Sequence, residues 1–260
     1  MASQISSKAE VSPRAKIGDN CKIFPFAYIE DDVVIGDGCI IFPFVSILNG
    51  TRMGNNTKVH QGAVVGALPQ DFNFRGEKTE LIIGNGNIIR ENVVINRATH
   101  TGGQTVIGNY NFLMEGSHIS HDTKVGDHCV FGYGTKIAGD CEIGDGVIFS
   151  SGVIENARTR VGEGSMIQAG TTFSKDVPPF VIAGGKPIAY SGPNFTMMTA
   201  NGIDEKVQKH VANAYRLVFH GQTSVFDAVL QIKAQVPDGP EIRIITDFLD
   251  STKTGIMSKV

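Results

Sequence analysis

A large apolar residue returns at every sixth position along most of this chain. The first run extends from Val11 to Val65, and later runs extend over 83–95 and 107–173. Twenty-four of the twenty-five positions in these runs are apolar, and the exception is Glu155. An α-helix repeats every 3.6 residues and a simple strand every 2, so neither explains the period. A parallel β-helix explains it, because each flat face of a coil turns one apolar side chain inward.

A second set of positions, four residues after each large apolar one, holds small side chains. Large and small residues thus alternate inward, as a narrow tube requires. All four cysteines fall in the small slot, at positions 21, 39, 129 and 141. We therefore expect them to be small core residues rather than metal ligands or disulfide partners.

Glycines follow the large apolar residue at intervals of eighteen, as at Gly18, Gly36 and Gly54. Eighteen residues are three hexads, so the pattern predicts a triangular coil with glycine at one corner. We expect glycine there because it adopts a positive φ at little cost.

The period divides the chain into a β-helix over residues 1–189 and a small α-helical domain over residues 190–260. Two breaks, at 67–80 and 99–105, predict loops that emerge from the scaffold, where functional residues are common. The prolines Pro178 and Pro179 predict the end of the ladder, since proline cannot donate to it.

Helical spacing begins after Tyr190. One apolar stripe runs from Val207 to Val218. A second helix is predicted from a Ser224 cap to Ile232, with Phe226, Val229 and Leu230 inward, and a third is predicted within Glu241–Asp250.

Composition excludes several classes of protein. The net charge of −3 argues against bulk nucleic-acid binding. The sequence has no run of eighteen apolar residues, and residues 1–10 have no apolar core of a signal peptide. We expect a cytoplasmic protein with no membrane insertion.

Candidate chemistry lies in the segment 117–122, which reads SHISHD. Ile119 is an inward position, so His118 and His121 are expected on the outside of the prism. Gly139 follows His121 by eighteen residues and is expected one coil further on, about 4.8 Å away. A base beside a bare amide is what acyl transfer needs, since the base takes an alcohol proton and the amide holds the oxyanion. Asp122 is a candidate to orient the imidazole of His121.

Several segments resemble the UDP-N-acetylglucosamine O-acyltransferase family of lipid A biosynthesis. They read ALPQDFNFRGEKT, IIRENVVINRAT, FLMEGSHISHD and DVPPFVIAGGKP, and the likeness covers almost the whole chain. The resemblance implies an all-β left-handed parallel β-helix of hexapeptide repeats followed by a small α-helical C-terminal domain. It also implies a cytoplasmic homotrimer with sites between subunits, acyl carrier protein and a UDP-sugar as partners, and no cofactor or metal.

The resemblance also implies roles for individual residues. His121 matches the general base and Gly139 the oxyanion donor. On the substrate side, His118 matches a neighbouring site histidine, Asp71 a loop aspartate that contacts sugar and acyl hydroxyls, and Asn194 an acceptor-side asparagine. Ala169 falls where the family gauges acyl length, and its small side chain suggests a long chain.

Other positions that match contacts of the family differ in residue type. Asn73 replaces a lysine, Asp140 a histidine, and Asn156 and Ala157 a His-Gln pair. In the nucleotide part, Thr196, Ala200 and Asn201 replace a glutamate and two arginines. Neutral side chains are poor substitutes for charged contacts to a diphosphate. The sequence therefore leaves two alternatives. Either UDP is bound by other residues, such as Arg75, Arg90, Arg97 or Lys186, or the acyl acceptor is a different molecule.

Two further hypotheses compete with an acyltransferase. A zinc enzyme on the same scaffold needs three converging imidazoles, which His118, His121 and either His100 or His128 would supply. A purely structural solenoid is the other. The sequence also leaves open whether Glu155 turns outward in a local bulge or has a function beside Asn156 and Arg158, since a lone buried carboxylate is costly.

Overall fold

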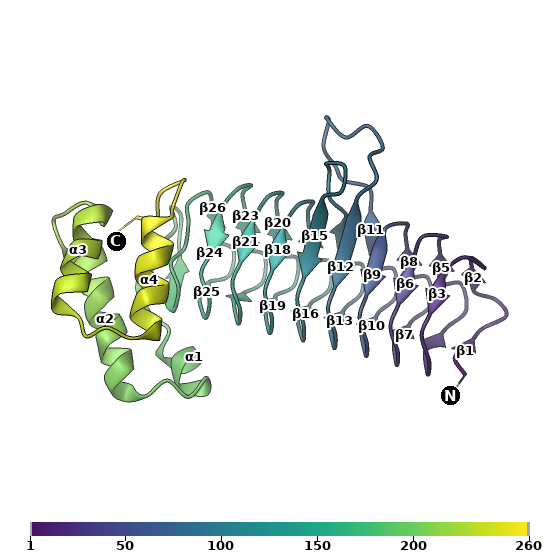
Figure 1. Ribbon diagram of the computed structural model, residues 1–260, viewed down its shortest axis with the longest axis horizontal. Helices are drawn as coiled ribbons and strands as arrows, with labels where there is room; N and C mark the ends of the chain where they lie inside the picture. Colours follow the sequence, from purple (N-terminus) through teal and green to yellow (C-terminus); the bar gives the residue numbers. More distant parts are fainter. Residues whose placement is uncertain (1, 259–260) are drawn as a thin grey trace.

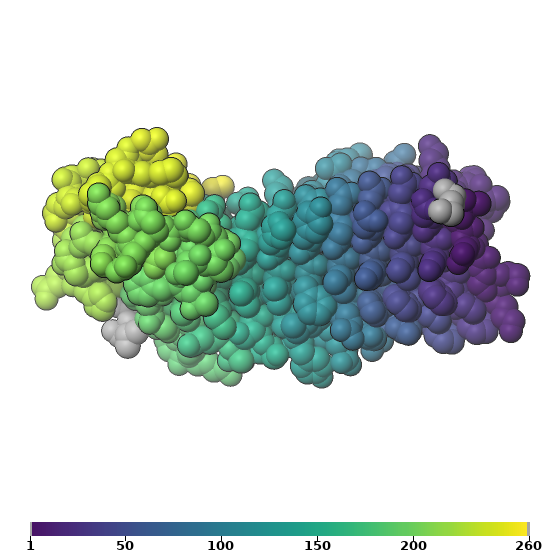
Figure 2. Space-filling view, turned by 90° about the horizontal axis from the view of Figure 1, so that it is seen from below, coloured from purple at the N-terminus to yellow at the C-terminus, as the bar shows by residue number. Residues whose placement is uncertain are grey.

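The computed structural model describes residues 2–258 as a rod with a cluster of helices at one end (Figure 1). Three parallel sheets form the three sides of a left-handed β-helix, as the hexad period predicts. The space-filling view shows the same elongated body, with the helices of the C-terminal part packed on the end of the rod (Figure 2). The predicted fold class is confirmed.

Most strands are two residues long, and each sheet takes every third strand of the chain. Sheet A contains β1 (Gln4–Ile5), β4 (Lys22–Ile23), β7 (Ile40–Ile41), β10 (Lys58–Val59), β13 (Ile88–Ile89), β16 (Phe112–Leu113), β19 (Val130–Phe131), β22 (Ile148–Phe149), β25 (Met166–Ile167), β27 (Val181–Gly184) and β28 (Ala189–Pro193). Sheet B contains β2 (Glu10–Val11), β5 (Tyr28–Ile29), β8 (Ser46–Ile47), β11 (Val64–Ala67), β14 (Val94–Asn96), β17 (His118–Ile119), β20 (Lys136–Ile137), β23 (Ile154–Glu155) and β26 (Thr172–Phe173). Sheet C contains β3 (Lys16–Ile17), β6 (Val34–Ile35), β9 (Thr51–Met53), β12 (Glu80–Ile83), β15 (Gln104–Ile107), β18 (Lys124–Val125), β21 (Glu142–Ile143) and β24 (Arg160–Val161).

The interior of the prism follows the predicted inward positions. In sheet A, Ile23 pairs with Ile41 one coil later, and both are buried. The small slot is buried as well, and all four cysteines are free thiols inside the tube. Burial raises the pKa of Cys39 to about 11 and the pKa of Cys129 to about 12, so these thiols are unreactive core residues. The interpretation of the cysteines is confirmed.

The repeated corner glycines are present for a different reason from the one predicted. Gly18, Gly36 and Gly54 do not adopt positive φ. A Cβ added to Gly18 would instead lie 2.7 Å from the carbonyl carbon of Gly36 in the next coil. Close stacking of successive coils therefore excludes a side chain there. The expectation of positive φ at these glycines was wrong.

Both breaks in the period are loops at the same corner, where the chain passes from sheet B to sheet C. Val64 pairs with Val94, and Val94 pairs with His118, so these steps are thirty and twenty-four residues instead of eighteen. The long loop joins β11 to β12, and the short loop joins β14 to β15. Figure 1 shows both loops rising on one side of the rod.

Sheets B and C end before the double proline, but sheet A continues beyond it. Pro178 and Pro179 follow β26, and β27 still pairs in parallel with β25. The antiparallel strand β28 then closes the sheet. The prolines thus end only two of the three ladders, because the chain returns to sheet A for one further coil.

The remaining described residues form four helices, α1 (Phe195–Ala200), α2 (Glu205–His220), α3 (Val225–Gln235) and α4 (Pro240–Asp250). Ser224 caps α3 as predicted, accepting a hydrogen bond from the N–H of Asp227. Phe226 and Leu230 were predicted inward, but they are 67% and 52% exposed, and Val229 alone of the three is buried. The buried stripe of α3 instead continues through Ala228 and Ile232. None of the helices within residues 2–258 has the length and apolar character needed to span a membrane.

Candidate active site

His121 lies at the corner between sheets B and C, in the turn that joins β17 to β18. This corner, which we call the B–C corner, also carries both inserted loops. Ile119 is fully buried, so the residues that follow it leave the core and bend around the outside. The prediction that His121 points away from the core of the prism is confirmed. The loops cover most of its side chain, which is 12% exposed.

The imidazole of His121 is held by Asp122. Its Nδ1 lies 2.9 Å from Oδ2 of Asp122. Neighbours on a strand point apart, but Asp122 adopts a φ of 59° in the turn, and this brings its carboxylate back to the ring. With Nδ1–H donating to the carboxylate, Nε2 keeps its lone pair and is free to act as a base.

Asp122 is fixed in turn by the short loop. The hydroxyl of Thr99 donates to Oδ2 of Asp122 at 2.7 Å, and the backbone N–H of Thr99 donates to the same carboxylate. Burial raises the pKa of Asp122, but the hydrogen bonds from Thr99 and His121 outweigh burial and hold the pKa below its usual value. Asp122 is therefore a stable anion beside the imidazole.

Gly139 lies directly over the ring of His121. A Cβ added to Gly139 would be 2.5 Å from Cε1 and 2.8 Å from Nε2 of His121, so a side chain there would displace the imidazole. The N–H of Gly139 donates no hydrogen bond within residues 2–258. A base and a free amide donor thus occupy successive coils, as the spacing of eighteen residues predicts.

The long loop brings Asp71 to the other side of His121. Oδ2 of Asp71 lies 3.9 Å from Nε2 of His121, so this ring nitrogen faces a carboxylate across a narrow gap. Asn73 is exposed in the same loop, and its N–H donates to Oδ1 of Asp71.

His118 occupies the outer face of β17, next to the B–C corner. Its Nε2 lies 2.6 Å from Oδ1 of Asn96, and Nδ2 of Asn96 donates to the carbonyl of Leu68 at the base of the long loop. Burial lowers the pKa of His118, and the positive charge of Lys136 lowers it further, so His118 is neutral at neutral pH.

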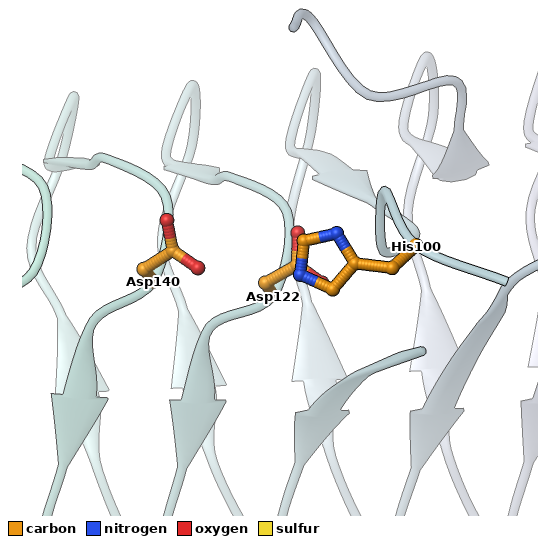
Figure 3. A group of neighbouring side chains, drawn as sticks. All are labelled: His100, Asp122 and Asp140. Atoms are coloured by element: carbon orange, nitrogen blue, oxygen red, sulfur yellow. The ribbon is translucent and has the colours of Figure 1, made fainter. Parts of the chain in front are cut away.

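Asp140 and Arg158 continue the corner beyond Asp122. Figure 3 shows His100 turned toward Asp122, with Asp140 one coil further along. Ligand atoms of these three residues lie within 4.8 Å of one another. Arg158 follows Asp140 by one coil, with Nε 3.9 Å from Oδ2 of Asp140, and its side chain is 80% exposed. It borders a cavity of about 570 Å³ that also includes Asp140 and Lys253.

The structure brings only part of the predicted substrate positions together within one chain. Asn156 is exposed at the B–C corner, one coil beyond Ala138. Ala169 is exposed at a different corner, between β25 and β26. Asn194 is 3% exposed and caps α1, where its Nδ2 donates to the carbonyl of Gly164. Ala169 and Asn194 therefore do not contribute to the surroundings of His121 in the same chain.

The cations that the sequence offered for UDP are mostly engaged elsewhere. Arg90 pairs with Glu91, and Arg97 donates to the carbonyl of Asn49. Arg75 donates to the carbonyl of Phe72 within its own loop. Lys186 is exposed in the turn between β27 and β28. Arg158, which was not among the residues suggested for UDP, is an exposed guanidinium at the B–C corner beside Asp140.

The imidazoles required for a zinc enzyme do not converge within one chain. The ring of His128 stacks on Tyr110 at another corner, and Nε2 of His118 is bonded to Asn96. In the described part of the chain, the one group of suitable ligands is His100, Asp122 and Asp140. Asp122 already accepts hydrogen bonds from Thr99 and His121, so this group does not favour a metal.

The sequence did not identify Thr99 and Asn96, which form hydrogen bonds with Asp122 and His118, respectively. Thr99 lies in the first turn of the short loop, and Asn96 is the last residue of β14. Asn96 precedes a break in the hexad period and Thr99 begins it. This position beside a break is the feature from which the sequence could have identified both residues. A break at the corner that carries His121 places the flanking polar residues next to that candidate residue.

The family model described as "Udp N-acetylglucosamine O-acyltransferase; Domain 2" matches residues 176–257. The model for the bacterial transferase hexapeptide of six repeats matches residues 14–45, 34–67 and 104–139. Residues 14–67 and 104–139 lie in the β-helix, and residues 176–257 include all four helices.

Full-length relatives agree with these matches. An acyl-[acyl-carrier-protein]–UDP-N-acetylglucosamine O-acyltransferase of Xanthomonas campestris is 37% identical, over 97% of each chain. The solved structure of LpxA, a UDP-N-acetylglucosamine acyltransferase from Bacteroides fragilis, is 45% identical with a TM-score of 0.96, covering 98% of this chain and all of that one. LpxA from Acinetobacter baumannii is 34% identical with a TM-score of 0.88, over 98% of this chain and 100% of its own.

Proposed function

The chain belongs to the UDP-N-acetylglucosamine O-acyltransferase family, and on that premise we propose that His121 is its general base and Gly139 its oxyanion donor. The protein is an acyltransferase that moves a 3-hydroxyacyl chain from acyl carrier protein to the 3-hydroxyl of UDP-N-acetylglucosamine, the first step of lipid A biosynthesis. We infer that residues of the B–C corner supply the chemical groups for this transfer.

The reaction needs one proton to be moved and one negative charge to be stabilised. Nε2 of His121 takes the proton of the sugar hydroxyl, and the oxygen attacks the thioester carbon. The tetrahedral oxyanion is stabilised by the free N–H of Gly139. When the carbon–sulfur bond breaks, the imidazolium returns its proton to the departing thiolate, and Asp122 stabilises the imidazolium in between.

One observation carries this proposal most directly: the ring of His121 lies against Gly139, with no room for a Cβ between them. A substrate carbonyl that reaches the amide of Gly139 is therefore within reach of the hydroxyl that His121 deprotonates. Asp71, Asn73, His118, Asp140 and Asn156 surround this point and are proposed to contact the substrates.

Arg158 is proposed to contact the diphosphate of the acceptor. Asp71, Asp122 and Asp140 place three carboxylates around His121, which repel a diphosphate from the centre of the site. The guanidinium of Arg158 lies one coil beyond Asp140 along the same corner, and its ion-pair partner within residues 2–258 is Asp140 at 3.9 Å. Guanidinium groups match phosphate oxygens in geometry and charge.

A homotrimer is proposed from the outer surface of sheet A. That surface carries one half-buried apolar side chain on most coils, whereas sheet C carries Lys16, Arg52, Lys124, Glu142 and Arg160 among its outward residues. The apolar row of sheet A consists of Ile40, Ile88, Phe112, Val130, Ile148, Met166 and Ile182. Rows of this kind on a soluble chain mark surfaces that other subunits cover.

A trimer would also allow Ala169 and Asn194 to contribute to the site of a neighbouring copy. In one chain both are remote from His121, so a role in gauging the acyl chain or contacting the acceptor requires a neighbouring copy. We further propose a cytoplasmic location, supported by four free cysteines, since reduced thiols are usual in that compartment.

An acceptor screen with loaded carrier protein tests the proposed reaction. The purified protein is incubated with 3-hydroxyacyl carrier proteins of increasing chain length, and products are identified by mass spectrometry. We expect a single ester with UDP-N-acetylglucosamine and none with its 3-deoxy analogue, which lacks the hydroxyl. Transfer to the 3-deoxy analogue, or to an unrelated acceptor alone, would contradict the proposal.

A further inference from the structure

Glu155 is the charged residue in an otherwise apolar set of inward positions. It lies on β23 between Ile137 and Phe173 of the two paired strands, and its side chain is 0% exposed. No bulge turns it outward, so that alternative from the sequence is wrong. A carboxyl group inside the prism, two residues from the B–C corner, has no part in the proposed acyl-transfer steps.

The hydrogen bonds around Glu155 determine how many protons the group holds. The hydroxyl of Thr159 lies 2.8 Å from Oε1 of Glu155 and 2.7 Å from the carbonyl oxygen of Asn156. Thr159 has one proton, and the carbonyl has none to give. With Glu155 ionised, the Thr159 proton is shared between the two acceptors; with Glu155 protonated, Glu155 donates to Thr159 while Thr159 donates to Asn156, and both contacts are full hydrogen bonds.

The two other groups that face Glu155 act in opposite directions. The thiol of Cys141 lowers the pKa of Glu155, whereas the carboxylate of Asp176 repels a second anion and raises it. Oε2 of Glu155 has no hydrogen-bond partner within residues 2–258. Burial, with a contribution from Asp176, raises the pKa of Glu155 to about 8.

The turn that Glu155 braces is the turn that holds the Gly139 amide. The N–H of Ala138 donates to the carbonyl of Glu155 at 3.0 Å, and the carbonyl of Gly139 accepts from the N–H of Arg158 at 3.1 Å. These two bonds lie on either side of the peptide whose N–H is the proposed oxyanion donor. The bond from Glu155 to Thr159 spans the same turn from the inside.

We propose that Glu155, as a neutral carboxylic acid, is a positioning residue that braces the turn 156–159 and thereby fixes the oxyanion donor Gly139. Ionisation of Glu155 leaves the single proton of Thr159 to serve two acceptors and places a lone anion in the core. The turn then shifts, and the Gly139 amide moves with it. The inference rests on the proposed role of Gly139, and it makes acyl transfer sensitive to alkaline pH.

The test compares wild type with Glu155→Gln and Glu155→Leu from pH 6 to 10, with kcat and KM measured for both substrates. Gln has the same shape, stays neutral and can donate to Thr159, whereas Leu fills the core without the bond. We expect wild-type kcat to fall above about pH 8 with KM unchanged. Glu155→Gln should keep the neutral-pH kcat and lose this decline. Glu155→Leu should lower kcat about tenfold or more at every pH, since loss of an oxyanion donor costs about 10²–10³-fold.

Thermal unfolding and subunit association are followed in the same samples, so that a misfolded variant is recognised. The unfolded carboxyl ionises near its ordinary pKa, so wild-type stability should fall as pH rises from about 4.5 toward 8, and Glu155→Gln should not show this loss. A folded Glu155→Leu with wild-type kcat, or an unchanged alkaline decline in Glu155→Gln, would overturn the inference. If wild type transfers no acyl group at all, the proposed function fails instead, and the unfolding data still test the neutral state of Glu155.

Discussion

At the residue scale, three neighbouring residues surround the imidazole of His121. One ring nitrogen is held by Asp122, the other faces the gap toward Asp71, and the ring lies against Gly139. The spacing of eighteen residues was enough to predict the pair His121 and Gly139 from the sequence. The bond to Asp122 was only a candidate, because it depends on the positive φ of Asp122, which no hydrophobic pattern reveals.

Replacing Asp122 with Asn should lower kcat by about 10²-fold or more, because the imidazole loses the anion that fixes its tautomer and stabilises its charged form. Steady-state transfer at pH 7 measures this effect. Asp238→Asn is the matched control, since Asp238 is an exposed residue that pairs with Arg243 in the helical domain. Equal rates for the two variants would contradict the orienting role of Asp122.

Replacing Arg158 with Ala should raise KM for UDP-N-acetylglucosamine about tenfold or more and leave kcat nearly unchanged, as loss of a charged hydrogen bond to a phosphate predicts. Lys209→Ala on α2 is the control, since that side chain is exposed and pairs only with Glu205. A KM effect confined to the acyl carrier protein would reassign Arg158 to the phosphopantetheine phosphate of the donor.

At the element scale, the regular stacking of coils places residues of successive coils side by side. The two loops then add further residues around His121. The hexad period predicted every face of the prism and the place of both loops. The period did not predict that the two loops share one corner with His121. That result depends on how many residues each coil with a loop contains, and the pairing of Val64 with Val94 in the structure gives that number. The wrong orientation of Phe226 and Leu230 in α3 has a similar cause, since apolar spacing does not say which face another helix covers.

Asn96 links the long loop to His118, because its amide contacts both His118 and the carbonyl of Leu68. Asn96→Ala should raise KM for UDP-N-acetylglucosamine about tenfold and destabilise the long loop, since His118 and the carbonyl of Leu68 lose their hydrogen bonds. Hydrogen exchange of residues 68–79 and steady-state kinetics measure the two effects. Gln104→Ala, which removes an exposed contact to Glu80, should change neither. Unchanged exchange in Asn96→Ala would refute this link.

At the scale of the whole molecule, one chain holds the proposed base and the proposed oxyanion donor but not every expected substrate contact. The sequence could not show why, because periodicity describes a single prism and not its neighbours. The apolar outer row of sheet A supports the proposed association of subunits, and Ala169 and Asn194 are the residues that a neighbouring copy would contribute.

An Asp in place of Ile148 on β22 should disrupt the trimer, because a charge would then be buried among apolar side chains of a neighbouring copy. We expect smaller species by analytical ultracentrifugation and at least a tenfold loss of transfer. Val106→Asp, on the outer face of sheet C, is the matched control and should remain trimeric. A trimeric and active Ile148→Asp variant would rule out sheet A as the interface.

The most direct test of the proposed mechanism is the rate of acyl transfer to UDP-N-acetylglucosamine by His121→Ala, measured in single turnover with preloaded carrier protein. The mechanism predicts a loss of about 10²–10⁴-fold, the usual contribution of a general base, with the oligomer and the unfolding temperature unchanged. A folded His121→Ala variant that transfers the acyl chain at nearly the wild-type rate would contradict it.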